Sequence, residues 1–262
     1  MNFIDCDCLI GQPPAPLHNG LRADQDDLLA EMDRIGVERA IVRHRLCAGY
    51  EPRTGNHACR TEIADHPRLL RTRMICPEGE RPDFDPDAAV DRMAADGFTV
   101  AWVHPKADQN PYSLQSWCAG RMLAALERRR IPTLVQFDTV DPDQLHQALK
   151  DHPRWPVILL MVPRLGRHRL IWALAQDCPN LHPCFNAASS ILDGLADLCK
   201  TIGPHRIVWG SGYPDSEPGS AVANLAWSGL ARPDQELIAH ANVQRLLAEA
   251  RHHDDRQRES DA

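Results

Sequence analysis

The sequence predicts an α/β protein folded as a (β/α)8 TIM barrel. Eight short apolar segments alternate with helix-like stretches along the 262 residues. The segments are apolar almost throughout, which is typical of parallel strands buried on both faces. The length suits a single barrel of about 250 residues. A doubly wound sheet is the alternative, but no glycine-rich turn follows the first predicted strand.

The first half of the chain contains four of the predicted units. The first strand, residues 2–6, leads through a long proline-rich segment to helix 24–37, whose leucines recur at helical spacing and which stops at Gly36. The elements that follow are predicted at 39–42 (strand), 57–67 (helix), 69–76 (strand), 86–97 (helix) and 98–105 (strand). Pro67 closes the second helix, and Pro86 and Gly97 bound the third.

The second half repeats the same alternation. Helix 115–130 ends in basic residues that suit the helix dipole. Asp141 caps helix 141–153, which has Pro142 at its first position. The remaining elements are predicted at 132–137, 156–162, 180–186 and 206–211 (strands) and at 168–179, 191–203 and 232–250 (helices). One barrel domain is therefore expected over 1–247, followed by a polar, flexible tail over 248–262.

Charge and composition exclude several classes of protein. The formal net charge is −7 and no basic stripe stands out, so no nucleic-acid partner is expected. The N-terminus has no secretory pattern, and no apolar run reaches the ~18 residues that span a membrane. The nine cysteines are scattered without a CxxC motif, which indicates reduced thiols and a cytoplasmic protein.

The opening stretch "IDCDCLIG" places two acids and two thiols at the end of the first strand. It has three interpretations: a metal site, a redox pair, or the remains of another site. Cys6 and Cys8 are two residues apart in a predicted strand, so we expect them to share one face. Neighbouring cysteines on a strand face seldom meet disulfide geometry, and two small buried residues are the simpler interpretation.

Several motifs together resemble one family. They are "LLAEMDRIGVERAIV", "GFTVAWVHP", "IPTLVQF", "PVILLMVPRLGR", "CPNLHPCFNAAS", "RIVWGSGYP" and "HANVQRLL". In this order they resemble the amidohydrolase superfamily, in its amidohydrolase-2 branch of hydrolases and decarboxylases, from about Ile4 to Leu247. The resemblance implies a distorted barrel with its site at the C-terminal ends of the strands, often in a homodimer.

The metal ligands of that family are replaced in this chain. The family's first strand ends in two histidines that bind a divalent metal, and the alignment puts Asp7 and Leu9 at those positions. Gln136 takes the place of a further histidine, Arg164 that of another, and Gly212 that of an aspartate. These side chains do not form a zinc site, so no metal and no other cofactor are expected. A rebuilt metal site using Asp7, Cys8 or Asp215 is the alternative.

Polar residues at the strand ends still give a candidate site. The catalytic candidates are His104, Asp7 and Asp215, and the substrate-binding candidates are Arg164, Gln136, Lys106, Asn186 and Tyr213. His104 could be a general acid or base near neutral pH, or a structural histidine. Arg164 could clamp a carboxylate or pair with Asp7 or Asp138.

These residues predict a small, anionic, carboxylate-bearing substrate. Some members of the resembling branch work without a bound metal, so acid–base chemistry without a metal is the leading hypothesis. The expected reactions are hydrolysis of an ester, lactone or amide, and decarboxylation. The alternative is a catalytically inactive barrel that binds a ligand or a partner chain.

Overall fold

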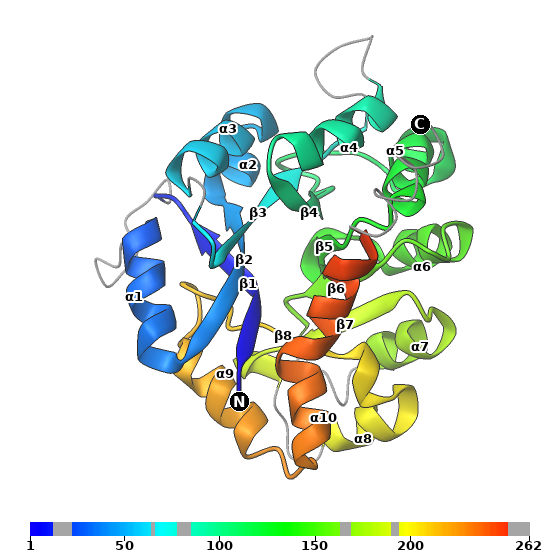
Figure 1. Cartoon of the computed structure of the whole chain (residues 1–262). Helices are drawn as coiled ribbons and strands as arrows, with labels where there is room; N and C mark the ends of the chain where they lie inside the picture. The colour runs from blue at the N-terminus through cyan, green and yellow to red at the C-terminus, as the bar shows by residue number, and fades with distance from the viewer. Residues whose placement is uncertain (13–22, 64–65, 78–84, 163–168, 190–193, 251–262) are drawn as a thin grey trace, which may run out of the picture.

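Eight parallel strands follow one another around a barrel in their chain order, which confirms the predicted TIM barrel (Figure 1). The computed structural model describes residues 1–12, 23–63, 66–77, 85–162, 169–189 and 194–250. The strands are β1 Phe3–Ile10, β2 Val37–His44, β3 Leu69–Met74, β4 Phe98–Val103, β5 Thr133–Gln136, β6 Val157–Leu160, β7 Leu181–Phe185 and β8 Val208–Trp209. An isolated parallel bridge between Cys8 and Tyr213 joins β1 to the chain just after β8.

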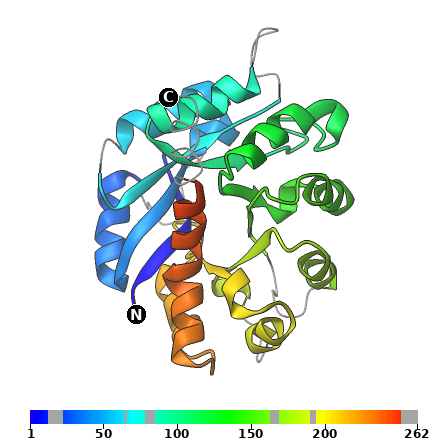
Figure 2. The same ribbon diagram turned by 45° about the vertical axis from the view of Figure 1, so that its right-hand side comes forward.

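The helices form a ring outside the strands (Figures 1 and 2). They are α1 Gln25–Ile35, α2 Arg45–Gly49, α3 Pro52–Glu62, α4 Pro86–Ala95, α5 Ser116–Arg128, α6 Pro142–Asp151, α7 Arg169–Asp177, α8 Gly194–Ile202, α9 Pro218–Ala226 and α10 Arg232–Glu236. A π-helical turn, Leu237–Ala241, continues α10, and residues 242–250 are again α-helical. The expected tail is therefore helical over residues 248–250, and residues 251–262 lie outside the described part of the chain.

Several elements differ from the sequence-based expectation. Helix α3 begins at Pro52 and ends at Glu62, so Pro67 does not close it, and β2 continues to His44. Strand β1 extends to Ile10, because its alternating acids and thiols are buried together rather than ending the strand. Helix α2 is one short turn, capped by the His44 side chain, and so has no helical periodicity to detect. Helix α9 begins at Pro218 behind the cap residue Glu217, in a stretch of small residues that lacks an apolar stripe.

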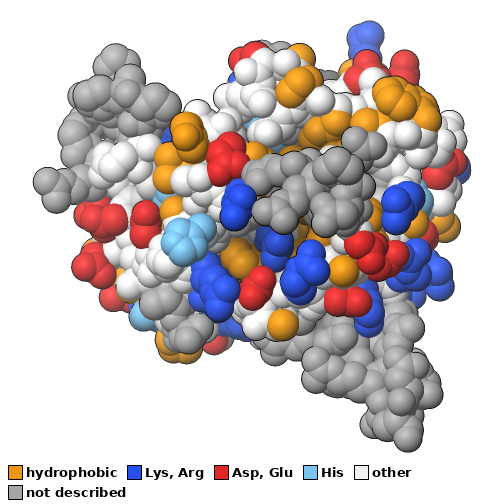
Figure 3. Space-filling view, turned by 90° about the horizontal axis from the view of Figure 1, so that it is seen from above, with side chains coloured by type: hydrophobic (Ala, Val, Ile, Leu, Met, Phe, Trp, Pro, Cys, Tyr) orange, Lys and Arg blue, Asp and Glu red, His pale blue; other side chains and the backbone are white. Residues whose placement is uncertain are grey.

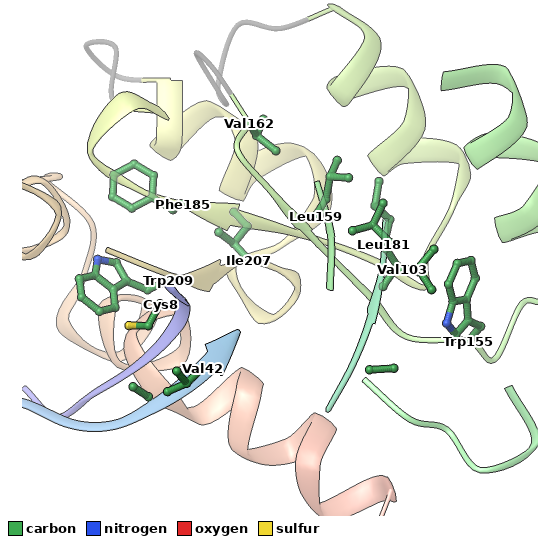
Figure 4. Close-up of a cluster of buried hydrophobic side chains, with 14 of the residues drawn as sticks. Cys8, Val42, Val103, Trp155, Leu159, Val162, Leu181, Phe185, Ile207 and Trp209 are labelled. Atoms are coloured by element: carbon green, nitrogen blue, oxygen red, sulfur yellow. The ribbon is translucent and has the colours of Figure 1, made fainter. Parts of the chain in front are cut away.

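The barrel has an inner and an outer hydrophobic cluster. The inner cluster contains Ile4, Cys6, Ile41, Leu70, Met74, Val100, Trp102, Leu134, Ile158, Leu160, Cys184 and Val208. The outer cluster packs the other strand face against the helices, and Figure 4 shows part of it around Cys8, Phe185 and Trp209. Burial on both faces explains why the strands are apolar throughout.

The final helical stretch covers the N-terminal end of the barrel. Val243, Leu246 and Leu247 belong to the inner cluster, together with Ile4 and Val208 near the strand starts. The Asn242 side chain donates to the carbonyl oxygens of Pro204 and Ile207, at 2.8 and 2.7 Å. These contacts leave the C-terminal ends of the strands as the end of the barrel at which a site is expected.

The surface carries charges of both signs. On the face shown in Figure 3, Lys and Arg side chains lie among Asp and Glu side chains and form no separate basic stripe. Within the described residues, none of the helices combines the length and apolar character needed to cross a bilayer.

We expect His182, on β7, to make the protein sensitive to acid. Burial lowers the pKa of His182 to about 3, and the nearby Arg245 charge acts in the same direction. The unfolded chain takes up this proton near pH 6.5, whereas the folded protein resists it, so stability falls as the pH falls from about 6.5 towards 3. The loss is about 1.4 kcal/mol of unfolding free energy per pH unit in this window.

Urea unfolding of His182→Gln at pH 7.5, 5.5 and 4.5 checks this prediction. Glutamine retains a donor for the Arg206 carbonyl oxygen, which lies 3.1 Å from His182 Nδ1, but it does not titrate. The variant should therefore lose less stability than the wild type between pH 7.5 and 4.5. Parallel losses in the two proteins would contradict the assignment.

Candidate active site at the C-terminal end of the barrel

A β-bulge in β1 shapes the strand around Asp7, one of the candidate site residues. The β1–β2 register shifts between Asp5 and Cys8, which inserts an extra residue into β1. The shift puts Cys6 in the inner cluster and Cys8 in the outer one, so the expectation that these cysteines share a face was wrong. Burial raises the pKa of both thiols, which therefore stay protonated.

Asp5 fixes the bulge to the segment after β8. Its Oδ1 accepts hydrogen bonds from the backbone N–H groups of Asp7 and Ser211, both at 2.9 Å. The Gly212 N–H donates to the Asp7 carbonyl oxygen at 3.1 Å. Asp5 thus supports the structure of the site by holding two strand ends together.

Removing this acceptor should destabilise the protein. Asp5→Ala leaves two buried N–H groups without their acceptor, and we expect a loss of about 2 kcal/mol in unfolding free energy. Asp5→Asn keeps a carbonyl oxygen at the same place, so its expected loss is below about 1 kcal/mol. Urea denaturation of the two variants beside the wild type measures the difference. Equal losses would show that Asp5 does not act as this acceptor.

Asp7 and Arg43 form a buried ion pair at the C-terminal ends of β1 and β2. Arg43 Nη2 donates to Asp7 Oδ1, and the residues are only 3% and 1% exposed. The guanidinium carbon of Arg43 lies 5.1 Å from the centre of the Trp102 ring, a cation–π contact. Sequence analysis missed Arg43, which stands two residues after the inward-facing Ile41 in the same strand.

The environment of Asp7 changes its proton affinity. Burial raises the pKa of the Asp7 carboxyl above its ordinary value, and the Arg43 charge opposes this rise. The nearby charges of Asp5 and Asp215 raise it further. A buried carboxyl with a raised pKa is suited to gaining and losing a proton during a reaction.

His104 follows β4 and lies on the same side of the barrel as Trp102. The two rings meet edge to face, with centres 5.1 Å apart. His104 Nε2 lies 2.8 Å from Gln109 Oε1, which can only accept, so Nε2 carries the proton. Burial lowers the pKa of the imidazole, with Arg43 acting in the same direction. His104 is therefore neutral near pH 7, and Nδ1 is a free base.

Four buried polar atoms of this group have no hydrogen-bond partner among the described residues. They are Asp7 Oδ2, Arg43 Nε, Trp102 Nε1 and His104 Nδ1. Two are donors and two are acceptors, and their residues are linked by the contacts given above. Buried polar atoms are normally paired, so these four define a place that water or a polar ligand completes. We call these four residues the mouth cluster.

Three of the other predicted residues, Gln136, Lys106 and Asn186, are not part of the mouth cluster. Gln136 ends β5 two residues after the inward-facing Leu134. Lys106 Nζ lies 3.8 Å from Asp108 Oδ1. Asn186 Oδ1 is taken up by Ser189, whose N–H and hydroxyl donate to it at 3.0 and 2.9 Å.

Three more candidates follow β6 and β8. Tyr213 is buried, and burial raises the pKa of its hydroxyl. Asp215 is half exposed and pairs with Arg45 Nη2 at 2.6 Å, so it lies outside the mouth cluster. Arg164 lies outside the described residues, and the described partner of Asp7 is Arg43.

A groove opens beside the mouth cluster. It has a volume of about 720 Å³ and lies between the chain segments that follow β4 and β5. Its lining includes Lys106, Tyr112 and Asp138. Tyr112 also accepts a hydrogen bond from the His104 N–H at 3.0 Å, so one segment both lines the groove and holds His104.

The residues at the family's metal positions do not fit a divalent cation. Asp7 already bonds to a guanidinium, and leucine and glycine at positions 9 and 212 offer no ligand atom. A Cβ built on Gly212 would lie 4.0 Å from Asp7 Oδ2, so a side chain there would reach the same place. The residues at the positions that the resemblance assigns to metal ligands are therefore unsuited to a divalent metal.

Among the described residues, one group of three potential ligands lies elsewhere, on α6 and at the end of α7. It comprises His146, Asp177 and Cys178. Asp177 Oδ2 already contacts His146 Nε2 at 2.7 Å and Lys150 Nζ at 3.3 Å. Burial raises the pKa of the Cys178 thiol, which therefore stays protonated. A neighbouring ammonium and a protonated thiol make this group a poor metal site.

Comparisons with known proteins agree with the barrel. A family model described as amidohydrolase matches residues 13–248. An uncharacterised TIM-barrel protein from Bordetella bronchiseptica has a TM-score of 0.71 at 17% identity, covering 95% of this chain and 99% of that chain. No match was found among curated proteins.

Two further solved structures have activities in their descriptions. A 2,6-dihydroxybenzoate decarboxylase from Rhizobium has a TM-score of 0.67 at 18% identity, covering 94% of this chain and 98% of that chain. A proposed 2-pyrone-4,6-dicarboxylic acid hydrolase from Pseudomonas putida has a TM-score of 0.67 at 16% identity, covering 94% and 97%. At these identities, the structural likeness establishes the fold alone.

Proposed function

Because the chain belongs to the amidohydrolase family, we propose that it acts on a small carboxylate-bearing molecule at the mouth cluster, by acid–base chemistry without a metal. One observation carries this proposal: the four buried polar atoms of the mouth cluster lack partners. Five other buried side-chain atoms of the described residues also lack a partner, so what distinguishes these four is that their residues contact one another.

The proton-carrying groups have complementary tasks. His104 Nδ1 is a neutral base, which suits removal of a proton from an attacking water in the hydrolysis of an ester, lactone or amide. Asp7 is ionised in its pair with Arg43, and its raised pKa suits it to take up the proton that His104 has removed and to pass it to the leaving group, or, in decarboxylation, to take up a proton from solvent and pass it to the carbon that loses CO₂. The same pair therefore serves both expected reactions, hydrolysis and decarboxylation.

A substrate screen tests the proposed activity. The first compounds are 2,6-dihydroxybenzoate and 2-pyrone-4,6-dicarboxylate, which two structurally similar proteins carry in their descriptions, followed by other aromatic and lactone carboxylates. Purified protein is treated with EDTA, and CO₂ release and ring opening are followed spectrophotometrically. We expect turnover that EDTA does not reduce and that Asp7→Asn abolishes.

The alternative is a catalytically inactive barrel that binds its ligand. In that case calorimetry would detect binding of a screened carboxylate, but no product would form at any pH. Turnover that appears only after Zn²⁺ or Mn²⁺ is added would contradict the proposed acid–base mechanism. The homodimer stays a prediction, which light scattering of the purified chain can measure.

A further inference from the structure

We propose that the Arg43 guanidinium is the built-in cation of the mouth cluster: it excludes a divalent metal and binds an anionic oxygen of the ligand in its place. This inference deepens the proposed function and rests on it for the identity of the ligand. The binding behaviour that it predicts can be measured without any turnover.

The first step of the argument is position. Arg43 Nη2 bonds to Asp7 Oδ1, while the other oxygen of that carboxylate lies 4.0 Å from where a Gly212 side chain would begin. Positions 43 and 212 thus approach the two oxygens of the same carboxylate, that of Asp7. A fixed positive charge beside Asp7 repels a second cation and already occupies one oxygen of its carboxylate.

The second step is unused hydrogen-bonding capacity. A guanidinium has five N–H donors in a fixed planar fork, and Asp7 accepts from one of the two on Nη2. Arg43 Nε has no partner among the described residues, although it is fully buried. The Trp102 face holds the guanidinium in place from one side. A carboxylate or similar oxyanion is the group that a partly filled guanidinium fork binds best.

The third step is the neighbourhood of that free edge. The Arg43 charge acts on His104, whose Nδ1 is also unpartnered. Arg43 and His104 both contact the Trp102 ring, so an oxyanion on Arg43 would lie near this base. In this arrangement Arg43 would hold the ligand in position, and His104 would accept a proton beside it.

Metal binding tests directly whether Arg43 excludes a divalent metal from the mouth cluster. Wild-type protein is dialysed against Zn²⁺ and Mn²⁺, and its metal content is measured by elemental mass spectrometry. A second protein carries Leu9→His, Gln136→His and Gly212→Asp, and a third adds Arg43→Gln to these changes. We expect fewer than about 0.1 metal ions per chain in the first two and about one in the third, with circular dichroism confirming that each is folded.

One metal per wild-type chain, removed by Asp7→Asn, would overturn the proposal. Equal zinc uptake by the second and third proteins would also overturn it, because Arg43 would then be no barrier to the metal. If the multiple variants fail to fold, the metal content of the wild type and the calorimetric titration with anions still test the proposal.

Anion binding tests the second part of the proposal, that Arg43 binds an anionic oxygen of the ligand. Formate, acetate and benzoate are titrated calorimetrically into the wild type, Arg43→Lys and, as a matched control, Arg45→Lys, whose guanidinium pairs with the half-exposed Asp215. We expect the wild type and Arg45→Lys to bind at least one of these anions, and Arg43→Lys to bind it at least 10-fold more weakly, because an ammonium lacks the fork. Binding of none of the three, or equal binding by Arg43→Lys, would overturn the proposal. Anion binding without any turnover in the substrate screen would leave it standing and refute only the proposed activity.

Discussion

Arg43→Met is expected to lower the free energy of unfolding by about 3–5 kcal/mol, because it leaves the Asp7 carboxylate buried without its partner. Methionine has a similar length, so little of the loss comes from an empty space. Because Asp7 can take up a proton when Arg43 is absent, the loss should shrink at low pH. Urea denaturation at pH 7.5 and 5.0 measures both effects.

A double variant separates the charge from the packing. Adding Asp7→Asn to Arg43→Met removes the stranded charge, and we expect the double variant to be more stable than Arg43→Met alone. The coupling between the two positions should therefore exceed about 1 kcal/mol. A double variant whose loss equals the sum of the two single losses would show that the ion pair does not link these positions.

His104→Gln is expected to reduce kcat by about 10²–10⁴-fold on the substrate found in the screen, because it removes the base at Nδ1. Glutamine places its amide nitrogen near the former Nε2, so the hydrogen bond to Gln109 can persist. The effect on unfolding should therefore stay near 1 kcal/mol. Steady-state kinetics and urea denaturation of the same preparation distinguish a chemical role from a structural one.

The dependence of kcat on pH tests independently whether His104 is the essential base. Because burial lowers the pKa of His104, the base stays neutral below pH 6.5, the ordinary value for histidine. Activity should therefore persist below pH 6.5 and fall only as the pH drops through the lowered value. A profile that already falls at pH 7 would assign the essential base to another group, and so would a His104→Gln kcat within about threefold of the wild type.

The barrel was predictable because its signals are local. Continuous burial of the strands and the spacing of the helices follow from short stretches of sequence, and Asp7 and His104 could be proposed because they stand in or directly after predicted strands. The prediction that Cys6 and Cys8 share a strand face was wrong because β1 contains a bulge. The bulge depends on how β1 pairs with β2 and with the segment after β8, and the alternation of residues within β1 does not reveal it.

Arg43 was missed for a similar reason. The predicted second strand stopped at Val42, since a charged residue after an apolar run is usually exposed. The strand continues to His44, and Arg43 is buried because Asp7, Trp102 and the bulge meet it in space. Burial of a charge is decided by its tertiary partner, which a single sequence does not display.

The closure of the barrel has a consequence for the burial of the Asp7–Arg43 ion pair. Strand β8 is two residues long, and its end is joined to β1 by the Cys8–Tyr213 bridge, by hydrogen bonds between Leu9 and Tyr213 and between Gly212 and Asp7, and by the Asp5 side chain. The junction between β1 and the segment after β8 is therefore made of a small number of hydrogen bonds, and Asp7 lies within it. A change that removes these bonds would expose the Asp7–Arg43 ion pair to water, so the stability of this junction and the burial of the ion pair are coupled.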